Sequence, residues 1–484
     1  MSLIVNGTEI ENVVVINKST GVSTEIETMQ DKNGNIIFEK ASSTDVILSV
    51  TRVDATISST ASSFVGIAVD TDVNTTAYIT YGGITKTVPY NSSNIGVYFG
   101  KYGTEEDDGT PVSGDMIITG AQSVRVYSYS IDKNTTGYCS CITGIKSWGL
   151  LDNVGTRMFY KCPITSIKIP KQIKIIRNNA FYECTNLSSV TIAEGLEEIE
   201  GSAFYKCTAL NTINLPSTLT DMQDSVFSYS AISSINSSVE GVIDLRNTKL
   251  KTYNNMVNYT DKVYRLYIPN TVETLYSTRE SLSSINSDTD NIANLENLVN
   301  LQSLSLANYS TVVHTFTRLN LPNISSLINL KLDINADNIT KINTNTTGLC
   351  DLSKYTAFNE STLLYTNCSK LTLSSSLSAI PTKMFQQVYS ITDIIIPSSV
   401  KSIGANAFAG CGPYHNKSGS VVFNTTTGWQ YYNSSTSTWT SISSSILSKT
   451  GYISGTLTAL TALCSSSSNT DTPGYANYEW RNTN

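Results

Sequence analysis

The chain has 484 residues and 40% of them are hydrophobic, so it can bury more than one core, and wholesale disorder is excluded. Charged residues make up only 15%, and Ser, Thr, Asn and Tyr are abundant, which favours strands and turns over exposed helices. A net charge of -7 and a pI near 5.1 argue against nucleic acid or anionic membranes as partners, because both attract clustered Lys and Arg.

The amino-terminal segment carries no export signal that we can identify. MSLIVNGTEIENVVVIN has neither a basic start nor an uninterrupted apolar run, and no later stretch approaches the roughly 18 apolar residues of a membrane helix. If the chain is complete, we expect it to be made in the cytoplasm without a secretion signal or an anchor of its own.

Residues 1–44 are predicted to form a small hairpin-rich module. NGTEI and DKNGNIIFEK place Asn-Gly turns between short apolar strands. The V-N-G and F-E motifs of this opening resemble motifs in tail-associated proteins of bacteriophages. That resemblance implies a docking module that contacts other virion proteins.

Residues 45–136 alternate apolar and polar residues in short runs that are broken by Gly, Asn and Asp, such as VILSVTRV, FVGIAV and SVRVYSYS. This pattern predicts a β-sandwich. AYITYGGITKTV, followed by GDMIITGAQSVRVYSYS, resembles the PKD-type immunoglobulin-like modules that precede repeats in gut-microbial proteins.

Residues 137–411 contain a repeat, which is visible when the chain is aligned on Phe159, Phe181, Phe204 and Phe227, separated by 22, 23 and 23 residues. Apolar residues recur at fixed offsets after each Phe, and I-x-x-I-x-I predicts a short strand whose alternate residues point inward. One such unit cannot cover its own apolar face, so the units must stack as a solenoid in which Phe and Cys are core residues.

The consecutive units RNNAFYECTNLSSVTIAEGLEEIEGSAFYKCTALNTINLPSTL resemble the BspA-like leucine-rich repeats of bacterial surfaces and some eukaryotic parasites. The pattern returns at Phe385 and Phe408. Between residues 237 and 369 it is looser, because L-x-x-L-x-L persists without the A-F-x-x-C turn, so longer or irregular units are expected there. Residues 412–484 are rich in Ser, Thr and aromatic residues and predict a terminal or capping β module. The fold class is therefore mainly β.

Few residues suggest catalysis or a cofactor. The two histidines, His314 and His415, have no flanking signature, and Cys184 and Cys207 occupy the buried turn of the repeat. The spacing of the nine cysteines fits neither a disulfide framework nor a zinc site. We therefore expect no enzyme activity and no cofactor.

The acidic residues offer weak calcium candidates. Asp70, Asp72 and Asn74 place oxygen ligands at alternate positions, but the Gly and the distal Glu of a calcium loop are missing. Residues 105–108, Glu-Glu-Asp-Asp, form a second acidic stretch. Both are more simply interpreted as solvated loops.

Two surfaces are candidates for binding. The outward strand positions of the repeats are small, polar and mostly neutral, and they could bind a glycan or a protein partner through hydrogen bonds: Ser166, Lys168, Ser189, Thr191, Thr212 and Asn214. The second is the aromatic tail, because exposed rings stack on sugars and anchor interfaces: Trp429, Tyr431, Tyr432 and Trp439.

These features predict a non-enzymatic recognition protein, carried on a phage virion, that binds a bacterial cell-surface protein or glycan. The alternative is a secreted BspA-like adhesin at a bacterial surface. A glycan-active enzyme that uses the repeats as a platform is a third option, which the missing catalytic motifs disfavour. Phage fibres are commonly trimeric, so the sequence also leaves association between copies of the chain open.

Overall fold

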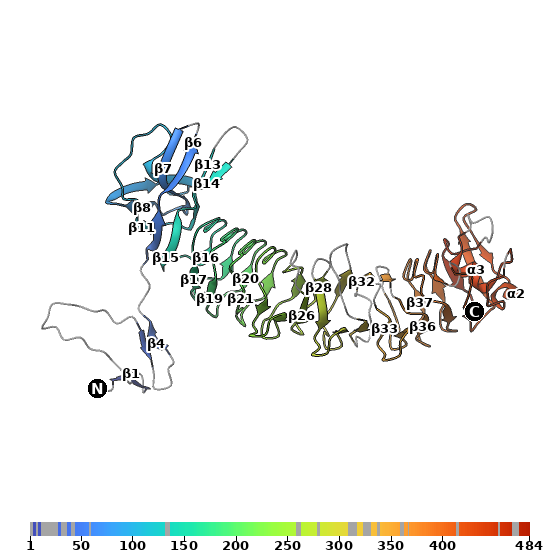
Figure 1. The fold of residues 1–484 in the computed structure, drawn as a ribbon. Helices are drawn as coiled ribbons and strands as arrows, with labels where there is room; N and C mark the ends of the chain where they lie inside the picture. The colour runs from blue at the N-terminus through green and yellow to red at the C-terminus, as the bar shows by residue number, and fades with distance from the viewer. Residues whose placement is uncertain are drawn as a thin grey trace. The chain divides into compact units, whose positions relative to one another are not determined.

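The computed structural model is mainly β, with a solenoid of repeats and almost no helix (Figure 1). It describes strands at residues 3–5, 8–10, 28–30 and 36–39, and then residues 44–484 except 58–59, 131–135, 258–262, 278–280, 308–316, 323–330, 336–338, 359–362, 366, 413–415, 454 and 467–473. The chain divides into two compact units, Met1–Leu151 and Asp152–Asn484.

The first 43 residues contain two short antiparallel strand pairs. β1 (Leu3–Val5) pairs with β2 (Thr8–Ile10), and β3 (Thr28–Gln30) pairs with β4 (Ile36–Glu39). These pairs flank the two Asn-Gly sequences that predicted hairpins. The docking role of this segment stays a prediction.

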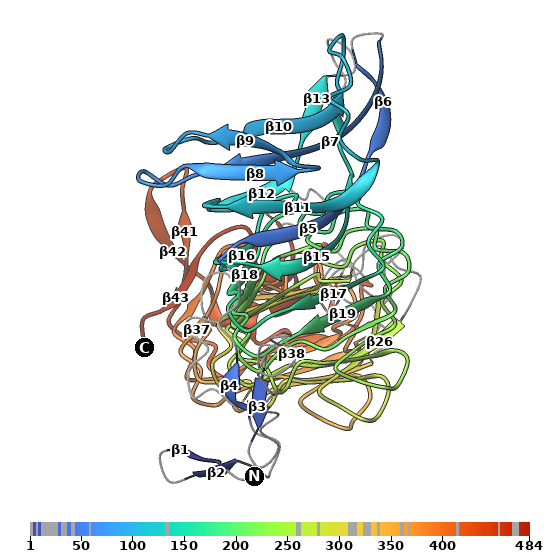
Figure 2. The same cartoon turned by 90° about the vertical axis from the view of Figure 1, so that its left-hand side faces the viewer.

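The rest of the first unit consists mainly of two antiparallel sheets, and Figure 2 shows their strands. One sheet has the order β15-β5-β11-β8-β9, and in the other β7 lies between β10 and β12 and also pairs with β6. Alternate residues of β5 are buried, as a strand with one face on a core requires. The Tyr81 and Phe99 rings, 5.7 Å apart, connect the two sheets. The strands are β5 (Val46–Thr51), β6 (Val53–Ile57), β7 (Thr60–Asp70), β8 (Ala77–Tyr81), β9 (Ile84–Val88), β10 (Ile95–Lys101), β11 (Ser113–Thr119), β12 (Ser123–Val126), β13 (Ser128–Ser130), β14 (Thr136–Tyr138) and β15 (Ile142–Trp148).

The solenoid begins later than the predicted residue 137. β15 pairs antiparallel with β5, with two register shifts, so this segment completes the edge of a sheet in the first unit. The first strand of the parallel stack is β16 (Asn153–Val154), which pairs with β18. The predicted boundary was too early because the sequence of β15 fits either an antiparallel edge strand or a repeat strand. Its pairing with β5 shows that it is an edge strand.

The regular repeats stack in register as the periodicity predicted. Ser166 of β17 lies beside Ser189 of β19, and Ile167 lies beside Val190. The Phe rings form a continuous stack, with centroids 5.1 Å, 4.9 Å and 5.5 Å apart from Phe159 through Phe227. Each buried ring is therefore covered by the ring of the next repeat.

The strands of the repeats fall on two sides of the coil. In chain order they are β16, β17 (Ser166–Ile169), β18 (Ile175–Ile176), β19 (Ser189–Ile192), β20 (Glu198–Ile199), β21 (Thr212–Ile213), β22 (Asp221–Met222), β23 (Ser234–Ile235), β24 (Val242–Asp244), β25 (Thr252–Asn254), β26 (Val263–Tyr267), β27 (Thr274–Ser277), β28 (Ser281–Ile285), β29 (Ile292–Asn294), β30 (Ser303–Ala307), β31 (Arg318–Asn320), β32 (Lys331–Asn335), β33 (Lys341–Ile342), β34 (Leu349–Leu352), β35 (Leu363–Tyr365), β36 (Lys370–Leu373), β37 (Ala379–Ile380), β38 (Asp393–Ile396) and β39 (Ser402–Ile403).

The loose middle region contains inserted strands. β23 and β24, β28 and β29, and β33 and β34 are parallel neighbours whose paired residues are only eight positions apart, as in Ile235 and Ile243. Each connecting loop starts at an Asn with positive φ: Asn236, Asn286 and Asn343. The side-chain oxygen of each of these Asn residues accepts a hydrogen bond from a backbone N–H of the preceding repeat. These Asn residues therefore fasten every inserted strand to the repeat before it.

Residues after Cys411 continue the solenoid and close it. β40 (Ser420–Phe423) extends the parallel sheet by pairing with β38, and β43 (Trp480–Asn482) pairs antiparallel with β39. The remaining elements of this cap are β41 (Trp429–Asn433), β42 (Thr438–Ser441), α2 (Ser444–Leu447) and α3 (Ala459–Cys464). Every residue of α3 is buried, so the cap shares its core with the last repeats.

Replacing Phe204 with Ala should destabilise the second unit by about 3–5 kcal/mol, because a fully buried ring is lost from the middle of a stack. Urea unfolding followed by circular dichroism measures this change. Thr191→Ala, which changes an exposed residue of strand β19, is the control and should leave the midpoint unchanged. A Phe204→Ala midpoint equal to that of the control would contradict the stacking account.

The contribution of the Asn343 hydrogen bonds can be tested with two substitutions. Asn343 accepts from the Leu321 N–H at 2.8 Å and donates to the Asp351 carbonyl at 2.8 Å. Asn343→Gly keeps the positive φ and should cost about 1–3 kcal/mol for the lost hydrogen bonds. Asn343→Ala should cost about 1 kcal/mol more, because Ala disfavours that backbone conformation. Equal unfolding free energies for the two variants would show that the backbone conformation makes no contribution.

Candidate binding surfaces

The six predicted strand-face residues form one exposed surface on the first three repeats. Ser166 lies beside Ser189 and Lys168 beside Thr191, and β21, which carries Thr212, lies next to β19. All six side chains are exposed, whereas the residues between them are buried or half-buried. The face is therefore a flat array of hydroxyl, amide and ammonium groups with a spacing of about 4.8 Å between strands.

Further along the stack, outward side chains of β26 are engaged by an inserted loop. The guanidinium of Arg265 pairs with Asp290 at 2.9 Å, and the Tyr267 hydroxyl donates to Asp288 at 2.6 Å. Both carboxylates come from the loop before the inserted strand β29. Side-chain contacts within the protein thus engage the outward groups of β26, whereas Lys370 and Thr372 of β36 and Ile395 of β38 are exposed, like the outward residues of the first repeats.

The predicted aromatic tail does not form a single platform. Trp429 is only 1% exposed, and its indole N–H donates to the Thr425 carbonyl at 2.8 Å. This residue is part of the cap core, so its assignment as a binding residue was wrong. The sequence did not predict this burial, because a buried and an exposed aromatic residue at the start of a strand fit the same alternating pattern.

The other three tail aromatics lie on the two faces of the β41 hairpin. The Tyr431 ring stacks on Tyr475 at 4.2 Å. Tyr432 and Trp439 are half-buried, with ring centroids 5.3 Å apart, and the Arg481 guanidinium lies 4.1 Å from the Trp439 centroid. Only Tyr432 and Trp439 therefore share a surface.

The calcium candidates are engaged by protein groups. Burial alone would raise the pKa of Asp70, but hydrogen bonds from Ser123 and from the Asn94 N–H, together with Arg125 at 2.7 Å, bring that pKa below its usual value. The Asn74 N–H and the Thr75 hydroxyl lower the pKa of Asp72. Within the part of the chain that the structure describes, no three His, Cys, Asp or Glu residues are grouped to hold a metal.

The second acidic stretch stabilises its own loop. Asp107 pairs with the Arg52 guanidinium, and this hydrogen bond, followed by one from the Gly109 N–H, lowers the pKa of Asp107 to about 2. Asp108 accepts the Gly100 N–H at 2.8 Å, and Glu105 accepts the Tyr98 hydroxyl at 2.6 Å. These carboxylates already have protein partners.

The cysteines of the repeat are poor nucleophiles. Burial raises the pKa of Cys184 to about 12 and that of Cys411 to about 12. Each thiol donates to the carbonyl of the Phe one repeat earlier, at 2.9 Å for Cys184 and 2.8 Å for Cys411. The two histidines, His314 and His415, lie outside the described residues.

A row of tyrosines, which was not predicted from the sequence, lies next to the Phe stack. Tyr160 stacks on Tyr182 at 4.9 Å, and Tyr182 on Tyr205 at 4.6 Å, with interplanar angles of 6° and 10°. Beside them Glu183 bridges Lys161 and Lys206, each at 3.2 Å. The F-Y pair in three consecutive repeats is the sequence signal for this row.

Comparison with known proteins identifies the repeats. Residues 128–233, 152–279 and 296–415 match the family model described as BspA type Leucine rich repeat region, with six copies. The matched segments together span more than half of the chain. None of the curated proteins compared with the chain matches it.

Solved structures of leucine-rich repeat proteins are also similar. One from Bacteroides capillosus is 28% identical, and the match covers 22% of this chain and 70% of that protein, with a TM-score of 0.17. The pneumococcal vaccine antigen PcpA is 17% identical, with coverage of 63% and 80% and a TM-score of 0.27. A leucine rich cell surface protein from Faecalibacterium prausnitzii is 17% identical, with coverage of 59% and 84% and a TM-score of 0.21. Among the described residues, no helix is long and apolar enough to cross a membrane.

The Arg52–Asp107 pair predicts a pH dependence for the first unit. The pKa of Asp107 is about 2 in the folded protein and near 3.8 in the unfolded chain, so the pair stabilises the fold above about pH 4, and the effect is lost as the pH falls toward 2. Urea unfolding between pH 5 and pH 2, read by hydrogen exchange of residues 95–119, should show this loss. In the Asp107→Asn variant this part of the pH dependence should disappear. A variant whose stability depends on pH as the wild type does would contradict the role of the Arg52–Asp107 pair.

Proposed function

This chain belongs to the BspA-type leucine-rich repeat family, and from that premise we propose that it is a non-enzymatic recognition protein that binds a protein or glycan of a bacterial cell surface. The observation that supports this best is the open strand face of the first three repeats. Six exposed polar side chains lie there, four of them on the paired parallel strands β17 and β19 and two at or just after β21. Such a surface can meet a partner without losing much side-chain entropy.

A binding role suits these groups better than catalysis. Proteins of this family are generally repeat scaffolds rather than enzymes. In the repeats the buried thiols donate to backbone carbonyls, and burial raises their pKa values, so neither a nucleophile nor a base is assembled from them. We therefore do not favour a glycan-active enzyme.

The cellular setting that we favour is a bacterial surface. Proteins of this family are typically found there, and the Faecalibacterium prausnitzii neighbour is described as a cell surface protein. The alternative is a phage virion, in which residues 1–44 would dock onto other virion proteins. Mass spectrometry of purified virions, compared with surface fractions of the producing bacterium, separates the two settings.

An assignment for the first unit and one for the whole chain also belong to this proposal. Residues 45–136 are proposed to form an immunoglobulin-like, PKD-like spacer, and their two antiparallel sheets support this. Association between copies of the chain is a further option, which sedimentation of the full-length protein would test.

Arginine substitutions on the strand face should abolish recognition. Ser189→Arg combined with Thr191→Arg places two long cations on the open face, so binding of the labelled protein to a panel of bacterial cells should fall at least tenfold in flow cytometry. Thr220→Arg, beside β22 on another side of the coil, is the matched control. Equal binding by the wild-type protein, the double variant and the control, with unchanged melting temperatures, would rule out this face as the binding site.

A further inference from the structure

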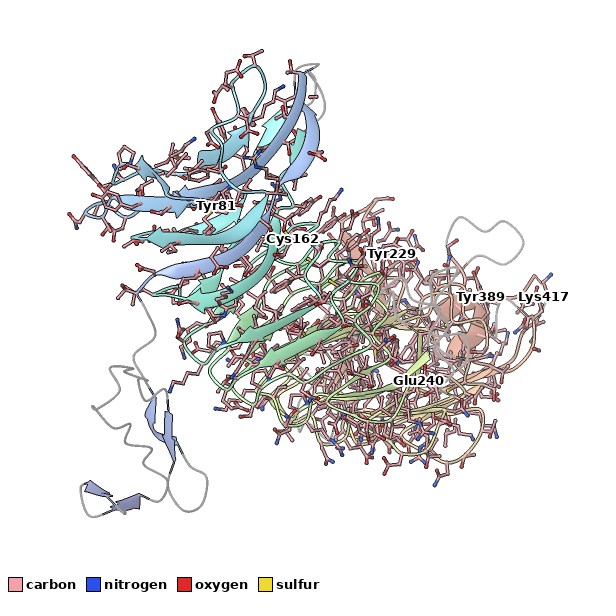
Figure 3. All side chains as sticks on the ribbon, turned by 60° about the vertical axis from the view of Figure 1, so that its left-hand side comes forward. Tyr81, Cys162, Tyr229, Glu240, Tyr389 and Lys417 are labelled. Atoms are coloured by element: carbon pink, nitrogen blue, oxygen red, sulfur yellow. The ribbon has the colours of Figure 1, made fainter. Side chains whose placement is uncertain are left out.

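A row of tyrosines runs along the first four repeats at the turn rather than on the strand face. Tyr160, Tyr182 and Tyr205 each follow the stacked Phe by one residue, and they stack on one another almost in parallel. Tyr229 ends the row: its ring lies 5.3 Å from Tyr205, is turned by 67° and is 43% exposed. In Figure 3, the labelled Tyr229 lies well apart from Glu240, which belongs to the loop before the inserted strand β24.

The fold itself does not require the tyrosines. In the last regular repeats Gln386 and Ala409 occupy the same position after Phe385 and Phe408, and those two rings still stack at 5.1 Å. The turn and its Phe stack therefore form without a tyrosine at this position. The tyrosines add a second, outer row that only the first four repeats carry.

The end of the row has a distinct construction. In the fourth repeat Ser228 takes the position after the Phe, where it is fully buried and its hydroxyl has no hydrogen-bond partner. The tyrosine of this repeat is shifted by one residue to position 229, where the backbone φ is 57°. This shift turns an aromatic ring outward at the end of a row whose other rings cover one another.

The row combines hydroxyl groups with charged side chains. Tyr160, Tyr182 and Tyr205 are half-buried, so part of each ring remains at the surface. Burial raises the pKa values of Tyr182 and Tyr205, so both stay protonated donors at neutral pH. Glu183 pairs with Lys161 and Lys206, so ammonium, carboxylate and hydroxyl groups lie side by side along the row.

We propose that the tyrosine row of residues 160, 182, 205 and 229 binds an extended, uncharged β-(1→4)-linked glycan. Such a chain has a sugar repeat similar in size to the spacing of the rings, 4.6–5.3 Å, so successive sugars meet successive repeats. Phenol, ammonium and carboxylate groups exchange hydrogen bonds with sugar hydroxyls. The outward ring of Tyr229 provides an apolar surface against which one sugar stacks. This site is separate from the strand face and does not depend on its role.

Cellohexaose and maltohexaose are the probes for this proposal, because both are uncharged glucose hexamers but only the first is extended. Isothermal titration of the full-length protein should show cellohexaose binding at least tenfold more tightly than maltohexaose. Equal affinities, or no binding of cellohexaose, would overturn the proposal. A protein ligand captured by this surface in the absence of oligosaccharide binding would also overturn it.

Two sets of variants identify the contacts. Y160F/Y182F/Y205F keeps the ring stack but removes the hydroxyl groups, and Y229A removes the outward ring; each should weaken cellohexaose binding at least tenfold. Y229F keeps the ring and should retain most of the affinity. If the triple variant does not fold, Y182F alone should weaken binding at least threefold. Hydroxyl-free variants that bind like the wild type would overturn the proposal.

The strand-face variant keeps the two proposals separate. Ser189→Arg with Thr191→Arg should retain cellohexaose binding, because those side chains lie on the outward strand face rather than at the tyrosine row. Loss of cellohexaose binding in this variant would place the glycan on the strand face and overturn the assignment to the tyrosines.

Discussion

The second unit depends on one constraint: each repeat must lie in register on the next. The backbone N–H of Phe159 donates to the carbonyl of Ala180 and that of Phe181 donates to Ala203, both at 2.8 Å, so each turn is held by the next repeat as well as by its own hydrogen bonds. Apolar columns impose the same offset, because a slip of one residue would turn the buried side of each strand outward. A repeat on its own would satisfy neither requirement.

In-register stacking also converts any residue type that recurs at one position into a row. The cations of the first repeat face the carboxylates of the second, as in Lys174 with Glu197 at 3.1 Å and Arg177 with Glu200 at 2.8 Å. The Lys174–Glu197 pair is exposed and contributes little stability, whereas Glu200 of the second pair is buried. Both pairs join residues 23 positions apart, as in-register stacking requires.

The stacking rule explains how far the sequence could predict this structure. The Phe and Ile columns, the strand positions and the outward face could be predicted, because all of them follow directly from the period. The turn geometry could not. Asn179 and Glu183 both have positive φ, although neither is Gly, and both backbone N–H groups donate to the following repeat. Stacking contacts thus stabilise a backbone conformation that local sequence disfavours.

Irregular middle units and a capping β module were predicted, but the positions of the inserted strands and the packing of the cap could not be, for a related reason. Paired residues eight positions apart, as in Ile342 and Cys350, fall outside the repeat period and leave no trace in a search for it. The cap does not follow the repeat, since β43 pairs antiparallel with β39. Its aromatic residues therefore pack over the end of the solenoid core. That is why Trp429 and Trp480 are buried there.

Periodic surfaces have a further consequence for recognition. Each of the first three repeats offers two polar side chains on its strand face, and a single hydrogen bond to a solvated hydroxyl contributes only about 1 kcal/mol. A partner with a matching repeat engages several such groups at once, and every contact after the first is intramolecular. A rigid ladder adds little entropic cost to this process, because its side chains are already ordered by stacking. The same register that makes the fold possible therefore favours linear, repetitive ligands over compact ones.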